Sequence, residues 1–147
     1  IKKGEKILVM FSGVAPSHCV IAKNSLAGTI YGIEANPKAH RYAQENVKRN
    51  KITNVLLIKG DVKKVVPRLK EKFERILLPL PKNAEEYLDL AVKKVKPKGT
   101  IYLYLFASKD DFAAVKKAYQ QRFKKVSMVE CGNYSPGVSR ICLELRN

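Results

Sequence analysis

The sequence predicts an α/β domain with a doubly wound, mostly parallel sheet of seven strands that ends in an antiparallel hairpin. Short apolar runs alternate with helical segments along most of the 147 residues, which is the element order of a parallel sheet. The last two strand segments follow each other without a helix between them, as in a hairpin at a sheet edge. No linker, repeat or low-complexity segment divides the chain, so residues 1–147 are expected to form one domain.

Each strand is predicted from a short apolar or β-branched run that turn residues bound. The expected strands are Ile7 to Phe11, Thr29 to Glu34, Val55 to Lys59, Arg75 to Leu78, Thr100 to Phe106, Val126 to Glu130 and Ser139 to Leu145. Turns are expected at 97–99, and at 131–137 between the last two strands.

The helices are predicted from their start signals and from apolar residues at helical spacing. They are expected from the loop 12–17 to about Asn24, and over 36–50, 62–69, Ala84 to about Val95, and 110–122. Asn36 and Pro37 are the clearest start signal, because Asn caps helices and Pro fits the first helical position. Asn83 is expected to cap the helix that follows it.

The chain is strongly basic, with 29 Lys and Arg against 13 Asp and Glu and a formal net charge of +16. Cations near phosphates release counterions, so such an excess favours a polyanionic partner. The lysine-rich surfaces of thermophilic proteins are an alternative, but they usually gain Glu together with Lys. A nucleic acid is therefore the expected partner.

The cysteine content and the lengths of the apolar runs indicate the cellular compartment. Cys19, Cys131 and Cys142 show no C-x-x-C spacing, so neither a disulfide framework nor a metal site is expected. No apolar run is long enough to span a bilayer and the start lacks a signal-peptide pattern, so we expect the cytoplasm and no membrane partner. The first residue is Ile1 rather than Met, which is compatible with a fragment that lacks an upstream segment.

Four segments are expected to meet where the carboxyl ends of the central strands bind ligands. The first is the loop 11–16, in which small residues around Gly13 let the backbone approach an amino-acid-like ligand. The second is Glu34, 21 residues after Gly13, which can accept both hydrogen bonds from a ribose diol. An exposed Glu or a helix cap is the alternative for Glu34.

The third segment is Gly60-Asp61-Val62, where Asp61 can accept from an adenine amino group or simply cap the next helix. The fourth is 78–82, where Pro79 and Pro81 fix an extended turn that could hold a flat base, with Lys82 near a phosphate. A plain loop is the competing interpretation of this turn. Because Gly13, Glu34 and Asp61 occur at this spacing, the three segments together are stronger evidence for a ligand site than any one of them alone.

These segments resemble the archaeal and eukaryotic tRNA methyltransferases that modify N1 of the guanine 3′ of the anticodon, with their wybutosine-pathway relatives. Residues 9–16 read V-M-F-S-G-V-A-P, where the family reads D-M-F-A-G-V-G-P. The segments 31–37 and 60–62 match its ribose-binding strand end and adenine-side turn, and 79–82 and 133–136 resemble N-L-P-K and S-Y-A-P. One family helix motif matches at His40, Tyr42, Glu45, Asn46, Lys48 and Asn50.

The resemblance implies a Rossmann-like class I methyltransferase domain that uses S-adenosylmethionine and acts on tRNA or another RNA. It also implies that the family's upstream tRNA-binding domain is absent from this chain. The implied cofactor-binding residues are Phe11, Gly13, Ala15, Glu34, Ala35, Asp61, Val62 and Pro79. The catalytic candidates are Pro79, Pro81 and Lys82.

Three positions depart from the family pattern. Val9 replaces an acidic residue, Ala15 replaces the second glycine of G-x-G, and Pro79 replaces the Asn of the catalytic motif. Proline has neither the amide side chain nor a backbone N–H, so the group that orients the target base is missing. Two further hypotheses therefore stay open: transfer of an aminocarboxypropyl group as in the wybutosine branch, and a noncatalytic RNA-binding domain.

Overall fold

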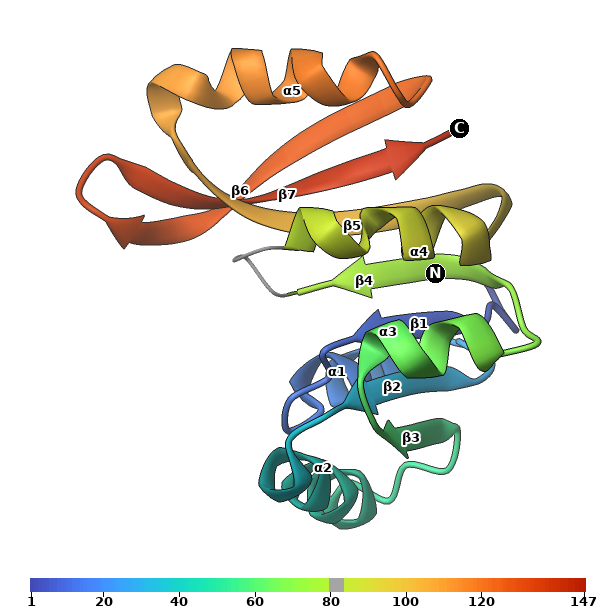
Figure 1. The fold of residues 1–147 in the computed structure, drawn as a ribbon. Helices are drawn as coiled ribbons and strands as arrows, with labels where there is room; N and C mark the ends of the chain where they lie inside the picture. Colours follow the sequence, from blue (N-terminus) through green and yellow to red (C-terminus); the bar gives the residue numbers. More distant parts are fainter. Residues whose placement is uncertain (80–83) are drawn as a thin grey trace.

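A computed structural model describes residues 1–79 and 84–147 of the chain. Its seven strands form one sheet in the order β3-β2-β1-β4-β5-β7-β6 (Figure 1). The first five strands pair in parallel, whereas β7 (Val138–Arg146) runs antiparallel to both β5 and β6 (Lys125–Ser135). The predicted doubly wound sheet with a terminal antiparallel hairpin is confirmed. The parallel strands are β1 (Ile7–Met10), β2 (Ile30–Glu34), β3 (Val55–Lys59), β4 (Phe73–Leu78) and β5 (Val95–Ser108).

Helices cover both faces of the sheet because alternate strand residues point to opposite sides. On one face, Ile7 and Val9 of β1 pack against α1 (Pro16–Asn24), and α2 (Pro37–Arg49) follows β2. On the other face, Leu8 and Met10 belong to a larger apolar core. That core is covered by α3 (Val62–Val65), α4 (Leu88–Lys94), α5 (Phe112–Gln120), and 3-10 turns at Val66–Arg68 and Ala84–Tyr87. A further 3-10 turn, Lys109–Asp111, leads into α5 and has no buried residue.

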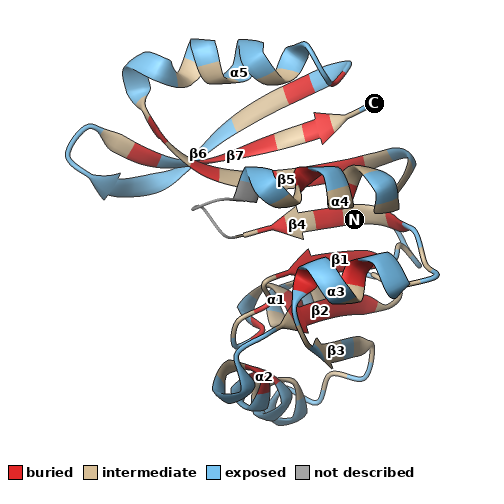
Figure 2. Ribbon diagram, in the orientation of Figure 1, coloured by how far each residue is buried: buried red, intermediate tan, exposed pale blue. Residues whose placement is uncertain are grey.

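Burial is concentrated in the central strands (Figure 2). All four residues of β1 are fully buried, as are Ile30, Ile33 and Ile76 on its two neighbours. At the edge of the sheet, no residue of β3 falls in the buried class. The sheet therefore holds β1 and the start of its following loop rigidly in the middle of the domain.

The C-terminal part of the fold differs from the sequence prediction in length and regularity. Strand β5 begins at Val95 and runs through the expected turn at 97–99, with Lys98 in a left-handed conformation (φ 63°) and a register shift against β4. Strand β6 likewise extends through most of the expected link 131–137, with register shifts near Asn133, and β7 begins at Val138, one residue earlier than predicted. The expected helix from Ala84 to about Val95 is a 3-10 turn followed by the shorter α4.

A buried histidine fixes α1 to the sheet. His18 is fully buried, and its Nε2 lies 3.3 Å from the carbonyl oxygen of Tyr31. A side chain at Gly32 would overlap the same imidazole and come within 2.9 Å of Leu57 Cδ2, so glycine is required there. Burial lowers the pKa of His18 to about 4, and the contact with Tyr31 only partly offsets that effect.

This buried imidazole predicts a loss of stability in mild acid. The unfolded chain protonates His18 near pH 6.5, while the folded chain resists protonation until about pH 4. His18 therefore contributes stability that is complete above pH 6.5 and is lost as the pH falls through 4, by about 3 kcal/mol in the free energy of unfolding. Urea denaturation of the wild type and His18→Gln at several pH values measures it. Equal pH dependence in both proteins would contradict the assignment.

Candidate functional site

Glu34 connects three loops at the carboxyl edge of the sheet. Its Oε2 accepts a hydrogen bond from the backbone N–H of Gly13 (2.8 Å), in the loop after β1. Its Oε1 accepts from the N–H of Asn36 (2.8 Å), at the start of α2, and its carbonyl oxygen accepts from the N–H of Gly60 (2.9 Å), after β3. The predicted segments around Gly13, Glu34 and Asp61 therefore lie together at the carboxyl ends of β1, β2 and β3, next to the point between β1 and β4 where strand order reverses.

The loop after β1 is held at several other points. The N–H of Ser12 donates to the carbonyl of Ile33 (2.9 Å), and Nδ2 of Asn46 in α2 donates to the carbonyl of Val14 (2.9 Å). Each of these bonds fixes a backbone group that would otherwise be solvated. The loop is thus organised by the structure around it, as a ligand-binding backbone must be.

Three residues of this loop take the left-handed conformation: Phe11 (φ 59°), Gly13 (φ 54°) and Ala15 (φ 66°). Strand β1 ends one residue earlier than predicted, and Phe11 instead packs edge-to-face on Tyr87, with 4.6 Å between ring centroids. A side chain at Gly13 would meet open space, whereas the methyl group of Ala15 is fully buried. The left-handed conformation costs a non-glycine residue about 1–2 kcal/mol, so Ala15 occupies a position that suits glycine better.

Asp61 acts as the N-cap of α3. Its Oδ1 accepts from the N–H of Lys63 (2.7 Å), and the residue is exposed at the same edge as Glu34. The helix-cap alternative therefore holds for one of its oxygens. The side chain of Val62 is buried in the core, so a ligand could meet this residue only through its main chain. Ala35 is exposed beside Glu34.

Two adjoining cavities flank the loop. One, of about 320 Å³, is lined by Val9, Gly13 and Pro79 together with loop neighbours. The other, of about 560 Å³, shares Pro79 with it and extends to Tyr104 on β5 and Arg140 on β7. Pro79 thus lies between a pocket at the loop and an open pocket with an aromatic and a cationic wall. Pro81 and Lys82, the other catalytic candidates, lie outside the described residues, as does Asn83.

Sequence reasoning did not single out Tyr104 and Arg140, which the antiparallel pairing of β5 with β7 brings to the cavity. Arg140 lies over the Tyr104 ring, with 5.5 Å from Cζ to the ring centroid. Because the two residues lie far apart in the sequence, no local sequence pattern indicates that they line one cavity. Alternation along β5 would have predicted only that Tyr104 faces the same side as Tyr102, and placing Arg140 there requires the register of β7 against β5.

Across residues 1–79 and 84–147, no cluster of three or more His, Cys, Asp or Glu could hold a metal ion. Within the same residues, no helix has the length and apolar character needed to cross a bilayer.

The TRM5/TYW2 methyltransferase domain model matches residues 1–131. The chain belongs to this family. Trm5b from Pyrococcus abyssi, a tRNA (guanine(37)-N(1))-methyltransferase, is 36% identical over 110 residues, covering 75% of this chain and 32% of the relative. Taw21 from Saccharolobus solfataricus, a tRNA 4-demethylwyosine(37)-methyltransferase, is 39% identical over 104 residues, covering 71% and 39%. An aminocarboxypropyltransferase from Methanocaldococcus jannaschii that acts on tRNA(Phe) is 27% identical over 98% of this chain and 60% of its own length.

Solved structures of family members have the same fold. Trm5b from Pyrococcus abyssi superposes with a TM-score of 0.85 at 29% identity, covering 99% of this chain and 45% of that one. Trm5 from Methanocaldococcus jannaschii in complex with adenosine gives 0.85 at 26% identity, covering 99% and 44%. The chain spans about a third to three fifths of the curated relatives that it matches.

The geometry of Glu34 predicts that it orders the loop even without a ligand. Glu34→Gln replaces one acceptor oxygen with an N–H₂ group, so one of the two backbone N–H groups of Gly13 and Asn36 loses its partner. Amide hydrogen exchange at one of these positions should become faster, by roughly tenfold for a bond of 1–2 kcal/mol. Glu45→Gln, on the exposed face of α2, is the matched control. Equal exchange at both amides in all three proteins would contradict the role of Glu34.

Proposed function

We propose that residues 1–147 form an S-adenosylmethionine-dependent methyltransferase domain that acts on tRNA, at guanine N1 next to the anticodon or at a related site. The observation that carries the proposal is the Glu34 carboxylate, which is held beside Gly13 next to the topological switch point of the sheet. Membership of the TRM5/TYW2 family supports it. The proposed location is the cytoplasm.

The residues at this edge fit a nucleoside with an attached amino acid. Each carboxylate oxygen of Glu34 accepts one backbone N–H, and a carboxylate has about four acceptor sites, so capacity remains for the two ribose hydroxyls. Oδ1 of Asp61 caps α3, so we propose that its other oxygen, Oδ2, accepts the hydrogen bond from the adenine amino group. The open space over Gly13 leaves room for the amino-acid part against the loop backbone. We propose main-chain contacts for Phe11, Ala15, Ala35 and Val62.

When bound, this cofactor supplies an electrophilic methyl group. The chain's own residues then have to hold the acceptor base in line with that group, since positioning provides most of the rate of such a transfer. Pro79 borders both cavities and can present a flat base without donating a hydrogen bond. Pro81 and Lys82 remain catalytic candidates by sequence alone, because they lie outside the described residues.

Transfer to guanine N1 also requires a group that removes a proton. Among the described residues that line the two cavities there is no carboxylate and no histidine. Glu34 and Asp61 are committed to the backbone and, in this proposal, to the cofactor. The acceptor atom is therefore either a nitrogen that carries no proton, or one whose proton leaves to a group outside these linings.

One observation favours a second function, transfer of an aminocarboxypropyl group. The relative with that activity aligns with 98% of the chain. This transfer places a different carbon of the cofactor next to the acceptor. The apolar Val9 lines the cavity proposed for the amino-acid part, whereas the methyl of Ala15 is buried outside that lining and would act only through the shape of the loop. Binding of RNA without any transfer would instead indicate a noncatalytic domain.

A double-label experiment tests these hypotheses. The chain is incubated with bulk tRNA and with a cofactor that carries different labels on its methyl and aminocarboxypropyl groups. The proposal predicts that the methyl label enters tRNA. The aminocarboxypropyl label in tRNA would support the second function and contradict the first. If neither label is transferred although both molecules bind, the domain is noncatalytic.

The cofactor assignment predicts a loss of affinity on truncation of Glu34. Glu34→Ala should weaken S-adenosylmethionine binding by about 1–3 kcal/mol, because charged hydrogen bonds to the ribose are lost. Isothermal titration calorimetry measures this change, with Glu45→Ala as the control of equal charge. An unchanged affinity in Glu34→Ala would remove Glu34 from the cofactor site.

A further inference from the structure

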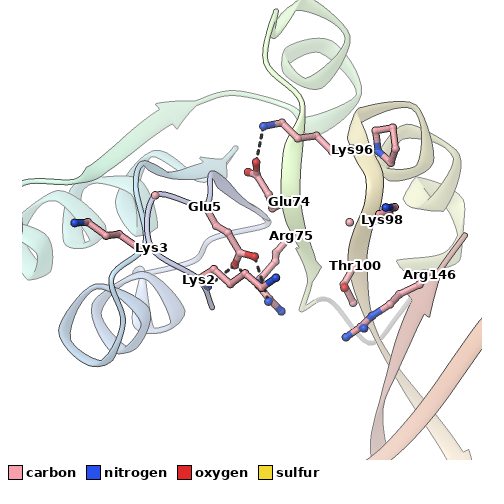
Figure 3. A pocket seen from close by; sticks show the side chains of 12 residues that line it. Lys2, Lys3, Glu5, Glu74, Arg75, Lys96, Lys98, Thr100 and Arg146 are labelled. Carbon is pink, nitrogen blue, oxygen red and sulfur yellow. Dashed lines mark hydrogen bonds and ion pairs between the residues drawn. The ribbon is translucent and has the colours of Figure 1, made fainter.

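A basic cavity of about 470 Å³ lies at the amino-terminal edge of the sheet, opposite the Glu34 edge (Figure 3). Its walls come from the segment before β1, from the starts of β4 and β5, and from the end of β7. Among the described residues, six cationic side chains but only two carboxylates, Glu5 and Glu74, line it. The cations are Lys2, Lys3, Arg75, Lys96, Lys98 and Arg146.

Both carboxylates already have partners within the chain. Glu5 binds Arg75, with 2.7 Å between Oε2 and Nε, and Glu74 binds Lys96 and accepts from the N–H of Lys6 (2.7 Å). Burial alone would raise the pKa of Glu5, but the hydrogen bonds from Arg75 and Lys2 keep it below its usual value. These carboxylates are therefore ionised at neutral pH and neutralise Arg75 and Lys96.

The remaining cations leave an excess of positive charge in the cavity. Lys2, Lys3 and Lys98 are exposed at its rim, and the ion pair of Arg146 with Glu144 is long, at 3.6 Å. Figure 3 shows the side chains of Lys98 and Arg146 on the same side of the cavity as Thr100. Like charges gathered in a concavity repel one another and concentrate anions from solution.

The backbone that carries these lysines is fixed. The N–H of Gly4 donates to the carbonyl of Leu26 (2.9 Å), and the N–H of Gly28 donates to the carbonyl of Glu5 (2.9 Å). At the other wall, Lys98 is held in the left-handed conformation between paired parts of β5. The main-chain positions from which these lysines project are therefore set before any anion binds, which lowers the entropic cost of gathering them around one.

We propose that this cavity binds a phosphate group of the RNA backbone, away from the modified nucleotide. The inference rests on the proposed function, because it requires RNA as the substrate. The central strands are 4 to 6 residues long. At about 3.3 Å per residue the two edges lie roughly 13–20 Å apart, which an extended RNA can span and a single nucleotide cannot.

The test compares two double variants that each remove two exposed lysines. Lys3→Gln/Lys98→Gln changes the cavity, and Lys116→Gln/Lys117→Gln changes the exposed surface of α5 by the same charge. Binding of a tRNA transcript is followed by fluorescence anisotropy from low to physiological salt. The cavity variant should bind at least about tenfold more weakly at low salt and lose about one unit from the slope of log K against log salt, whereas the α5 variant changes little. S-adenosylmethionine binding by calorimetry should be the same in all three proteins.

Equal RNA affinity and salt slope in the two variants would overturn the cavity assignment and leave the proposed function standing. A wild-type chain that binds S-adenosylmethionine but not tRNA would contradict the RNA part of the proposed function, and the cavity assignment with it. Inorganic phosphate, titrated at constant ionic strength, separates the two sources of the anion. Tight phosphate binding in the cavity without an effect of the cavity variant on RNA would indicate a free anion and overturn the proposal.

Discussion

The Glu34 carboxylate ties the end of β2 to the loop after β1 and to the start of α2, while its carbonyl ties in the turn after β3. Parallel strands place these connections side by side, but they do not determine the shape of the loops. The hydrogen bonds to Gly13 and Asn36 supply that shape, and Asn46 completes it from α2. The proposed cofactor site depends on this one acid because it orders the loop and, in the proposal, also binds the ribose.

The two proposals place two kinds of ligand contact at opposite edges of the sheet. At the carboxyl edge, backbone groups and a few acids fit a small neutral or cationic ligand next to the cavity that Pro79 borders. At the amino edge, cations around Glu5 and Glu74 fit a polyanion. Part of the net charge of +16 is thus gathered around one cavity. This arrangement agrees with the proposed RNA substrate, which would extend beyond the pocket in which the transfer takes place.

The sequence predicted most of the fold because strand and helix signals agreed with each other along the chain. The spacing of Gly13, Glu34 and Asp61 also predicted correctly that the three residues share one edge of the sheet. It could not predict that Glu34 binds the loop directly, because this depends on backbone N–H directions. The lengths of β5 to β7 were underestimated, since bulges and left-handed residues such as Lys98 carry pairing through segments that look like turns.

The cavities were the least predictable feature. Tyr104 and Arg140 come together only through antiparallel pairing of distant segments. The basic cavity joins both ends of the chain with the start of β5, and each lysine alone looks like ordinary surface. Such sites follow from topology rather than from local pattern.

A crystal structure of the chain with S-adenosylmethionine tests the central claim most directly. The account predicts that the Glu34 oxygens accept hydrogen bonds from both ribose hydroxyls while they keep their bonds to Gly13 and Asn36. A ribose that binds elsewhere, or a Glu34 side chain that turns away from it, would contradict the account.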